Sequence, residues 1–310
     1  MEAALAAGSD FAGYRIERVI GAGGMGEVYE ARPGEDGDRV ALKVLLPELG
    51  GEERLRRRFE REARLAGTLS HRHVVPVLRS GVADGRPFLV MPYIDGPDLG
   101  AVIAHEGPLH PADAGLIAYQ LGSALEAAHG AGLVHRDVKP ANVFVDVERG
   151  RPRAYLGDFG LTKSATSTSG LTRTGMYVGT VDYAAPEQLQ AEPLDGRADV
   201  YALGALLYQA LTARVPFPRA RPVDKIMAHL SEPPPRPSEA EDGVPGAFDD
   251  VVVRAMAKSA DDRFQTAGEL GKAALAATRD AGSAPPWRES RRADRRAAER
   301  RADPEAPTAA

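Results

Sequence analysis

Residues 133–143 (LVHRDVKPANV) place an aspartate, a lysine and an asparagine close together between two apolar runs. Asp137 is followed by Lys139 and then by Asn142, and a second aspartate, Asp158, comes in the stretch LGDFG. Phosphoryl transfer requires a carboxylate that orients a hydroxyl and accepts its proton, oxygen ligands for Mg²⁺, and positive charge near the transferred phosphate. Taken singly, each residue is also common in turns. Together and in this order, they indicate phosphoryl transfer.

A glycine-rich stretch near the N-terminus, IGAGGMGEV (residues 20–28), could bind phosphate groups. Gly21, Gly23 and Gly26 form a G-x-G-x-x-G frame, and glycine lets backbone N–H groups approach phosphate oxygens without a Cβ in the way. The frame lies between two predicted strands. A dinucleotide-binding oxidoreductase would instead need a helix directly after it. Taken alone, the frame is equally consistent with the turn of a β-hairpin.

A lysine and a glutamate in the first third of the chain could complete such a site. Alternation along the strand VALKVL (residues 40–45) places Lys43 on the face opposite to its two valines. A lysine inside an apolar strand is costly unless its charge has partners, for example phosphates and a carboxylate. The alternative is an edge-strand lysine that prevents aggregation. Glu62 borders the apolar face of a predicted helix and is a candidate carboxylate, although it could also be one more solvated charge.

The elements that must position these groups change in kind along the chain. Residues 14–46 and 74–94 carry strand patterns, and residues 52–69 carry the three- and four-residue spacing of a helix. Helical patterns dominate from residue 111 to about residue 277. Strands gathered before helices predict an α+β fold of two lobes that meet near residues 92–96.

The composition limits the class of protein. The chain has 310 residues, of which 43% are hydrophobic and 27% charged, and its net charge is −5. These values are ordinary for a globular protein and give no indication of nucleic-acid binding. The absence of cysteine excludes disulfides, thiolate metal sites and a cysteine nucleophile. There is no signal-peptide pattern and no apolar run of roughly 18 residues, so we expect a cytoplasmic protein with no membrane span in this chain.

These motifs stand in the register of a known family. The glycine-rich loop, the lysine of VALKVL, the run HRDVKPAN, DFG and the APE of AAPEQ together resemble the protein kinase superfamily, and most closely the bacterial eukaryotic-like serine/threonine kinases. The resemblance covers roughly residues 14–277. It implies a bilobal protein-kinase-like fold, with a β-rich N-lobe (about 14–92) containing one main helix and a mostly helical C-lobe (about 95–277). Residues 1–13 would be an N-terminal extension. Residues 278–310, rich in arginine and alanine, would be a disordered tail or solvated helix, and we expect residues 281–310 to be dispensable for catalysis and for stability.

The resemblance also assigns roles in the catalytic loop. It implies that Asp137 is the catalytic base, that Lys139 contacts the γ-phosphate, and that Asn142 and Asp158 bind Mg²⁺, or Mn²⁺ in its place. Thr180 would brace the first two of these residues. A lysine two positions after the base, together with this threonine, is typical of kinases that phosphorylate serine and threonine. His135 is expected to pack in the loop and not to act as a base.

For ATP, the resemblance implies a larger set of contacts. The residues implied to surround the nucleotide are Ile20, Gly21, Ala22, Gly23, Gly24, Met25, Gly26, Glu27, Val28, Ala41, Lys43, Glu62, Met91, Pro92, Ile94 and Phe144. Lys43 would hold the α- and β-phosphates and pair with Glu62. Met91 would be the gatekeeper, and Pro92 and Ile94 would offer backbone groups to adenine. Pro92 replaces an acidic residue often found there, but proline keeps the carbonyl that the contact uses.

Outside the nucleotide site, the resemblance implies two structural features. Glu187 would form a buried ion pair with Arg263, and Asp199 would brace the catalytic loop. Both features stabilise the fold and take no part in the chemistry.

Regulation is expected in the segment between Asp158 and Glu187, which is crowded with hydroxyl groups. In the kinases that the chain resembles, the arginine before the base, here Arg136, pairs with a phosphate on this segment. Thr172 and Thr174 match the phosphorylated T-x-T sites of the bacterial relatives. We expect autophosphorylation there through a transient homodimer, with serine or threonine residues of other proteins as further substrates.

Two alternatives remain open at this stage. An inactive kinase-like scaffold, or pseudokinase, would lack one of the key residues Lys43, Asp137, Asn142 and Asp158, and all four are present. A small-molecule kinase of the aminoglycoside type would share the two lobes. It normally lacks the GT…APE segment that forms a peptide platform in protein kinases.

Overall fold

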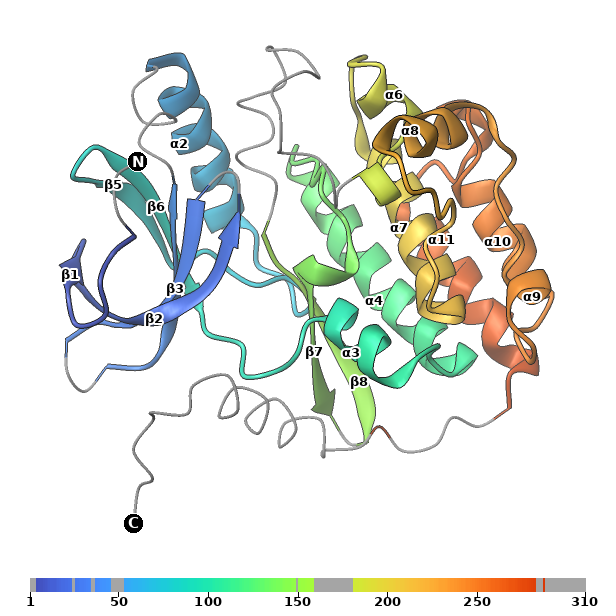
Figure 1. Ribbon diagram of the computed structural model, residues 1–310, viewed down its shortest axis with the longest axis horizontal. Helices are drawn as coiled ribbons and strands as arrows, with labels where there is room; N and C mark the ends of the chain where they lie inside the picture. Colours follow the sequence, from blue (N-terminus) through green and yellow to red (C-terminus); the bar gives the residue numbers. More distant parts are fainter. Residues whose placement is uncertain are drawn as a thin grey trace.

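The computed structural model describes most of the chain, namely residues 4–23, 26–34, 37–45, 53–148, 150–158, 181–282 and 287. The described residues form two lobes, one built mainly from strands and one mainly from helices (Figure 1). The predicted α+β bilobal architecture is therefore confirmed, including the change from strands to helices after Pro92.

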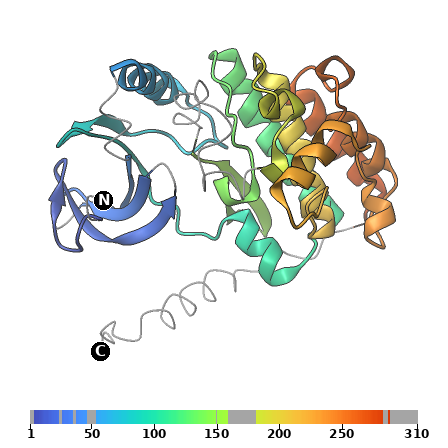
Figure 2. The same ribbon diagram turned by 45° about the horizontal axis from the view of Figure 1, so that its top comes forward.

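The N-lobe contains an antiparallel sheet. Among the described residues, its strands are β1 (Asp10–Phe11), β2 (Tyr14–Gly23), β3 (Gly26–Arg32), β4 (Val40–Leu45), β5 (Arg79–Ala83) and β6 (Arg86–Pro92). Their order in the sheet is β1-β2-β3-β4-β6-β5. The sheet curls strongly, as Figure 2 shows. Val40, Leu42 and Val44 of β4 pack in one core with Tyr29 and Phe88, so the opposite face of the strand carries Lys43.

The main helix of this lobe, α2 (Glu53–Thr68), agrees with the predicted helix. Its residues Phe59, Ala63 and Ala66 recur at three- and four-residue spacing and are buried. They share the main hydrophobic core with Leu45 and Leu89, which come from β4 and β6. The helix therefore covers the face of the sheet on which Lys43 lies.

The C-lobe is built around one long central helix. Its helices are α3 (Leu99–Glu106), α4 (Pro111–Gly130), α6 (Pro186–Leu189), α7 (Gly196–Thr212), α8 (Pro222–Ser231), α9 (Pro237–Ala240), α10 (Ala247–Ala255) and α11 (Ala267–Ala276). Helix α4 packs against α7 and α11. A Cβ added at Gly122 would lie 2.4 Å from the carbonyl oxygen of Ala267, so only glycine permits this approach of α11 to α4.

A two-stranded hairpin lies beside α4 at the face of the C-lobe toward the N-lobe (Figure 1). Its strands are β7 (Val143–Glu148) and β8 (Arg151–Leu156). The buried Gln120 of α4 holds the second strand, because its Nε2 donates to the Pro152 carbonyl at 3.1 Å and its Oε1 accepts from the Ala154 N–H at 2.7 Å. Asn142 directly precedes β7 and Asp158 follows β8 by two residues, so both lie at the open end of the hairpin.

The two ends of the described chain are attached to the lobes. Asp10–Phe11, within the predicted N-terminal extension, forms a strand of the sheet, and the Leu5 N–H donates to the Tyr29 hydroxyl at 2.9 Å.

In the part of the chain that the structure describes, no helix combines the length and the apolar character needed to cross a membrane.

Trp287 departs from the expected solvated tail. The residue is only 5% exposed and belongs to the main hydrophobic core. Its backbone N–H donates to the Gly150 carbonyl at 2.9 Å, next to the turn of the β7–β8 hairpin. The 3₁₀ turn Ala277–Asp280, at the start of the predicted tail, contacts α4 and α10. The prediction of a solvated tail is therefore revised for this turn and for Trp287, whereas residues 283–286 and 288–310 lie outside the described part of the chain.

Replacing Trp287 with alanine should lower the free energy of unfolding by about 3–5 kcal/mol, because a buried aromatic side chain is lost. The melting temperature should fall by roughly 5 °C, measured by calorimetry. Leu275→Ala, at a side chain that is 37% exposed on α11, is the matched control and should change little. Trp287 is the only tryptophan, so its fluorescence in the folded wild type should be that of a buried indole. An unchanged melting temperature and the emission of a solvated indole would contradict the docking.

Candidate functional site

The catalytic-loop motif is held by one buried carboxylate. Asp199, in the first turn of α7, is 1% exposed. Its Oδ2 accepts from the His135 N–H at 2.7 Å and its Oδ1 from the Arg136 N–H at 2.8 Å. The Nε2 of His129 lies 2.8 Å from the same Oδ2. These contacts satisfy a carboxylate that would otherwise be costly to bury, and they fix the backbone where Arg136 adopts a positive φ of 65°.

His135 connects this loop to the second strand of the hairpin. Its Nδ1 accepts from the Asp137 N–H at 3.3 Å, and its Nε2 donates to the Gly157 carbonyl at 3.0 Å. Both contacts suit the neutral ring, and complete burial lowers the pKa of His135 below its usual value. The ring therefore holds two backbone segments together, as expected for a packing residue.

Lys139 and Asn142, two residues that the sequence singled out, both contact the side chain of Asp137, the predicted base. Lys139 Nζ lies 3.0 Å from Asp137 Oδ2. The Nδ2 of Asn142 donates to the same oxygen at 3.2 Å and to the Asp137 carbonyl at 2.8 Å. The Asp137 side chain remains 11% exposed. The carboxylate is thus held by two fixed donors.

The two predicted metal ligands are tied to one another through the backbone. The Gly157 N–H donates to the Asn142 carbonyl at 2.9 Å, directly before Asp158. Because the amide nitrogen of Asn142 donates to Asp137, its side-chain oxygen is the atom that could bind a cation. A carboxylate and an amide oxygen fit Mg²⁺, which takes hard oxygen ligands. Among the described residues, no group of three or more histidine, cysteine, aspartate or glutamate side chains is arranged to hold a metal ion. Mg²⁺ usually keeps several waters and binds substrate phosphates, so one or two protein ligands suit it.

Lys43 lies in the site, but its partner differs from the expected one. Its Nζ contacts Asp158 Oδ1, whereas Glu62 Oε1 lies 3.6 Å from a guanidinium nitrogen of Arg136. In the described part of the chain, the implied Lys43–Glu62 ion pair is therefore replaced by two others. The exchange leaves each of the four charges with an opposite charge, so it costs little electrostatically. The orientation of α2 then decides which set of pairs forms.

The glycine-rich stretch is the end of a hairpin, as its position between two strands predicted. Gly21 pairs with Val28, and Gly23 pairs with Gly26 across β2 and β3. Gly26 has a φ of 149°. A Cβ there would lie 2.2 Å from the Val44 carbonyl oxygen, so the backbone of β4 leaves no room for a side chain at this position. The remaining loop residues Gly24 and Met25 lie outside the described residues.

The other residues implied to surround ATP fall on adjacent elements. On the sheet, Val28 pairs with Lys43, and Ala41 pairs with Met91. Those on or directly beside these strands are Ile20, Ala22, Pro92 and Ile94. Phe144 lies on β7 of the other lobe. Apart from Glu62 and Phe144, the described members of the set therefore lie on or next to neighbouring strands of one sheet. The Glu27 carboxylate accepts from the Tyr29 hydroxyl and lies 4.0 Å from Arg86.

Besides Gly24 and Met25, three further predicted residues are not placed by the structure. Thr180, the implied brace of the catalytic loop, lies outside the described residues. The same holds for the predicted phosphorylation sites Thr172 and Thr174.

The comparison with family models settles the classification. The model described as the protein kinase domain matches residues 14–268. The chain belongs to the protein kinase family.

Bacterial serine/threonine kinases are among its relatives. The chain is 44% identical over 270 residues to the serine/threonine-protein kinase PknE of Mycobacterium tuberculosis. The matched residues make up 87% of this chain and 47% of that protein. It is 43% identical over 273 residues to the serine/threonine-protein kinase PknH of Mycobacterium bovis, covering 88% of this chain and 45% of that protein. The chain thus spans about half the length of these relatives. A crystal structure of the Mycobacterium tuberculosis PknI kinase domain matches with a TM-score of 0.69 and 34% identity, over 88% of this chain and all of that one.

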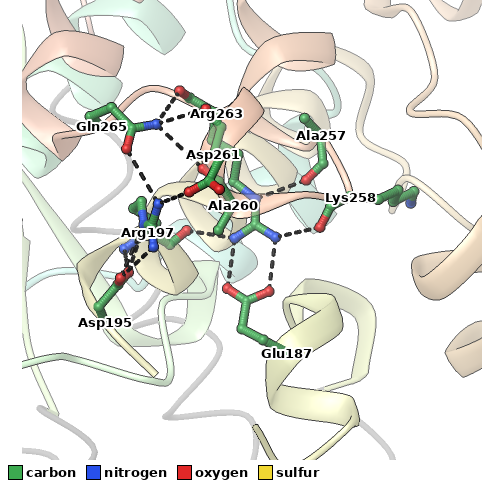
Figure 3. A network of polar contacts seen from close by, with 9 residues as sticks. All are labelled: Glu187, Asp195, Arg197, Ala257, Lys258, Ala260, Asp261, Arg263 and Gln265. Atoms are coloured by element: carbon green, nitrogen blue, oxygen red, sulfur yellow. Dashed lines mark hydrogen bonds and ion pairs between the residues drawn. The ribbon is translucent and has the colours of Figure 1, made fainter. Parts of the chain in front are cut away.

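The kinase C-lobe contains the implied buried ion pair. Arg263 is 1% exposed, and its two terminal nitrogens donate to the Glu187 carboxylate at 2.7 and 2.8 Å (Figure 3). The same guanidinium donates to the carbonyls of Ala257, Lys258 and Arg197. One arginine therefore joins four segments, including α6, which carries the A-P-E motif.

Gln188 lies beside this ion pair, and its role was not predicted from the sequence. Its Nε2 donates to the Arg136 carbonyl at 3.1 Å, and its Oε1 accepts from the Ala185 N–H at 3.1 Å. It thus connects α6 to the catalytic loop. A glutamine directly after A-P-E was the available signal, since glutamine can both donate and accept.

Replacing Glu187 with alanine should lower the free energy of unfolding by about 3 kcal/mol, because it leaves the buried Arg263 guanidinium without its carboxylate. Urea denaturation would measure the effect. Asp261→Ala is a matched control in the same network: Asp261 Oδ1 lies 2.6 Å from Arg197, but its side chain is 87% exposed. An ion pair so exposed should contribute less than about 1 kcal/mol. Equal effects of the two substitutions would show that burial of Arg263 does not set the energy of the pair.

Proposed function

We propose that this kinase domain transfers the γ-phosphate of Mg·ATP to serine and threonine hydroxyls of proteins. The observation that carries the proposal is the arrangement of Asp137 with Lys139 and Asn142, 3.0 and 3.2 Å from one carboxylate oxygen, on a loop held by Asp199. The 43–44% identity to proteins named serine/threonine-protein kinases supports the same reaction. The kinase domain would extend over residues 14–277.

In this reaction, the substrate hydroxyl binds next to Asp137. The carboxylate orients the hydroxyl and accepts its proton as the oxygen attacks the γ-phosphorus. The bond between the γ-phosphorus and the bridging oxygen of the β-phosphate breaks, and ADP leaves. The ammonium of Lys139 balances negative charge on the transferred group. Asn142 and Asp158 would hold Mg²⁺, or Mn²⁺, which neutralises charge on the phosphates when it is bound.

Lys43 would bind the α- and β-phosphates from the N-lobe. It already lies beside Asp158, so the nucleotide would enter between two charges that now pair with each other. Glu62 would then leave Arg136 and pair with Lys43. The 3.6 Å contact of Glu62 with Arg136 shows that α2 is near enough to the catalytic loop for its glutamate to be held there.

The peptide platform favours protein substrates over small alcohols. Arg263 and Glu187 fix α6, and Gln188 ties that helix to the catalytic loop. A small-molecule kinase would have no use for such a platform. Lys43 and Asp137 are both present, and each is paired with an opposite charge in the site, which argues against an inactive scaffold. We further propose a cytoplasmic location and a transient homodimer for autophosphorylation.

Replacing Asp137 with asparagine should lower kcat by about 100-fold or more, because the proton acceptor is lost. Lys43→Met should also reduce activity strongly. The measurement is incorporation of labelled γ-phosphate into a generic protein substrate, with a small alcohol such as an aminoglycoside as a second acceptor. Asp261→Asn, at a side chain that is 87% exposed on the C-lobe, is the control and should leave kcat unchanged. Near-wild-type incorporation by either site variant would contradict the assigned roles, and transfer to the alcohol alone would favour the small-molecule kinase.

Phosphorylation of Thr172 and Thr174 should activate the enzyme. Each phosphate adds about −1.5 to −2 charges, which should attract Arg136 and release Glu62 toward Lys43. Mass spectrometry of protein incubated with ATP should find both threonines modified, and unmodified in the Asp137→Asn variant. The double variant Thr172→Ala, Thr174→Ala should lose most activity, whereas Ser167→Ala, Ser169→Ala should not. Full activity of the threonine double variant would refute this mechanism.

A further inference from the structure

A group of charged and aromatic side chains surrounds the connection between the lobes, outside the residues implied to bind ATP. Its members come from β2, from β3, from the residue directly before β4 and from the segment after β6. We call this group the hinge clamp, and it consists of Arg18, Glu30, Arg39, Tyr93 and Asp95. The last two flank Ile94, the residue implied to offer its backbone to adenine.

Glu30 is the buried centre of the hinge clamp. The residue is 4% exposed. Its Oε2 lies 2.7 Å from a terminal nitrogen of Arg18, and its Oε1 lies 3.3 Å from one of Arg39. A carboxylate buried on a strand requires such partners, so each arginine is held in a defined position on the sheet.

Both arginines extend from Glu30 to the hinge. Arg18 donates to the Tyr93 hydroxyl at 3.3 Å, and Arg39 donates to Asp95 Oδ2 at 3.2 Å. The Arg39 guanidinium also lies over the Tyr93 ring, 4.6 Å from its centroid, and the Arg39 carbonyl accepts from the Tyr93 N–H at 3.4 Å. Four contacts thus attach residues 93–95 to the N-lobe sheet.

The next residues are attached to the other lobe. The Val145 N–H of β7 donates to the Pro97 carbonyl at 3.1 Å. A Cβ added at Gly96 would lie 2.7 Å from the Val145 carbonyl oxygen, so the backbone there is packed closely against the hairpin. Asp98 forms a bridge with Phe144. The chain therefore changes from N-lobe to C-lobe contacts between Asp95 and Gly96.

We propose that Arg18, Glu30 and Arg39 are positioning residues for the adenine-binding backbone. They hold Ile94 in place relative to the neighbouring strand that carries Ala41, so that the lobes pivot after Asp95 and the adenine site moves as one body with the N-lobe. This inference rests on the proposed function, since it takes Ile94 as the adenine contact. Under the proposed function, Lys43 and the metal would bind the phosphates elsewhere, so loss of the clamp should weaken binding of the base and leave the chemical step intact.

The test compares three variants of the full chain. The double variant Arg18→Met, Arg39→Met keeps the apolar stems and removes the charges. The single variant Arg39→Lys keeps Arg18 and retains a positive charge at position 39, near Glu30 and Asp95. Arg32→Met is the matched control, because Arg32 pairs with Glu17 across the same two strands but does not touch the hinge. Each variant is assayed for KM of ATP, for kcat and, by calorimetry, for the Kd of adenosine, which has no phosphates.

The double variant should raise both the KM of ATP and the Kd of adenosine by about tenfold, with kcat within about twofold of wild type. Arg39→Lys should recover part of the affinity, and Arg32→Met should match wild type. An unchanged adenosine Kd in the double variant, or an equal loss in Arg32→Met, would overturn the proposal. A fall in kcat at constant KM would do so too. If wild type binds adenosine but transfers no phosphate, the proposed function fails, while the adenosine affinities still decide on the clamp.

Discussion

The hydrogen bonds of the buried Asp199 carboxylate are the interaction on which the rest of the catalytic region depends. Two successive backbone N–H groups, of His135 and Arg136, donate to its two oxygens at 2.7 and 2.8 Å. That arrangement fixes the peptide plane between them and maintains the positive φ of Arg136. Asp137 follows directly in the same loop, so the position of the proposed base is set by a carboxylate on α7 and by the ring of His135.

Burial of charge is the recurring constraint in both lobes. In the C-lobe, Arg263 is satisfied by Glu187 and three carbonyls, and in the N-lobe Glu30 is satisfied by two arginines. Each of these groups would be strongly destabilising without its partners. The partners come from distant segments, so satisfying the charge also joins those segments. The need to pair buried charges thus fixes α6 beside the catalytic loop, and it also fixes the connection between the two lobes.

Much of the fold and of the site could be predicted from the sequence. The two-residue alternation of β4 placed Lys43 on the face opposite to Val40, Leu42 and Val44. The spacing of Phe59, Ala63 and Ala66 predicted α2. Asp137, Lys139 and Asn142 lie within six residues of one another, so local geometry alone keeps them together. Residues of this kind are predictable because their contacts are short in sequence or fixed by periodicity.

Other features depend on the angle and register of distant elements. The pairing of Glu62 with Arg136 depends on how α2 is rotated, which no local pattern contains. Arg18 and Tyr93 meet across 75 positions, and neither residue type is unusual where it stands. Trp287 lay in a polar stretch, and only the assembled C-lobe could show where its ring would be buried.

The most direct test of the role of Asp199 is amide hydrogen exchange at His135 and Arg136, comparing wild type with Asp199→Asn. Asparagine has the same shape but a single side-chain oxygen, so it cannot accept from both N–H groups. Losing one of these bonds in a buried site costs about 1–3 kcal/mol, so exchange at one of the two amides should accelerate by roughly 10- to 100-fold. The far-ultraviolet spectrum should stay native, and kcat should fall with the lost protection. Unchanged protection of both amides together with an unchanged kcat would contradict the account.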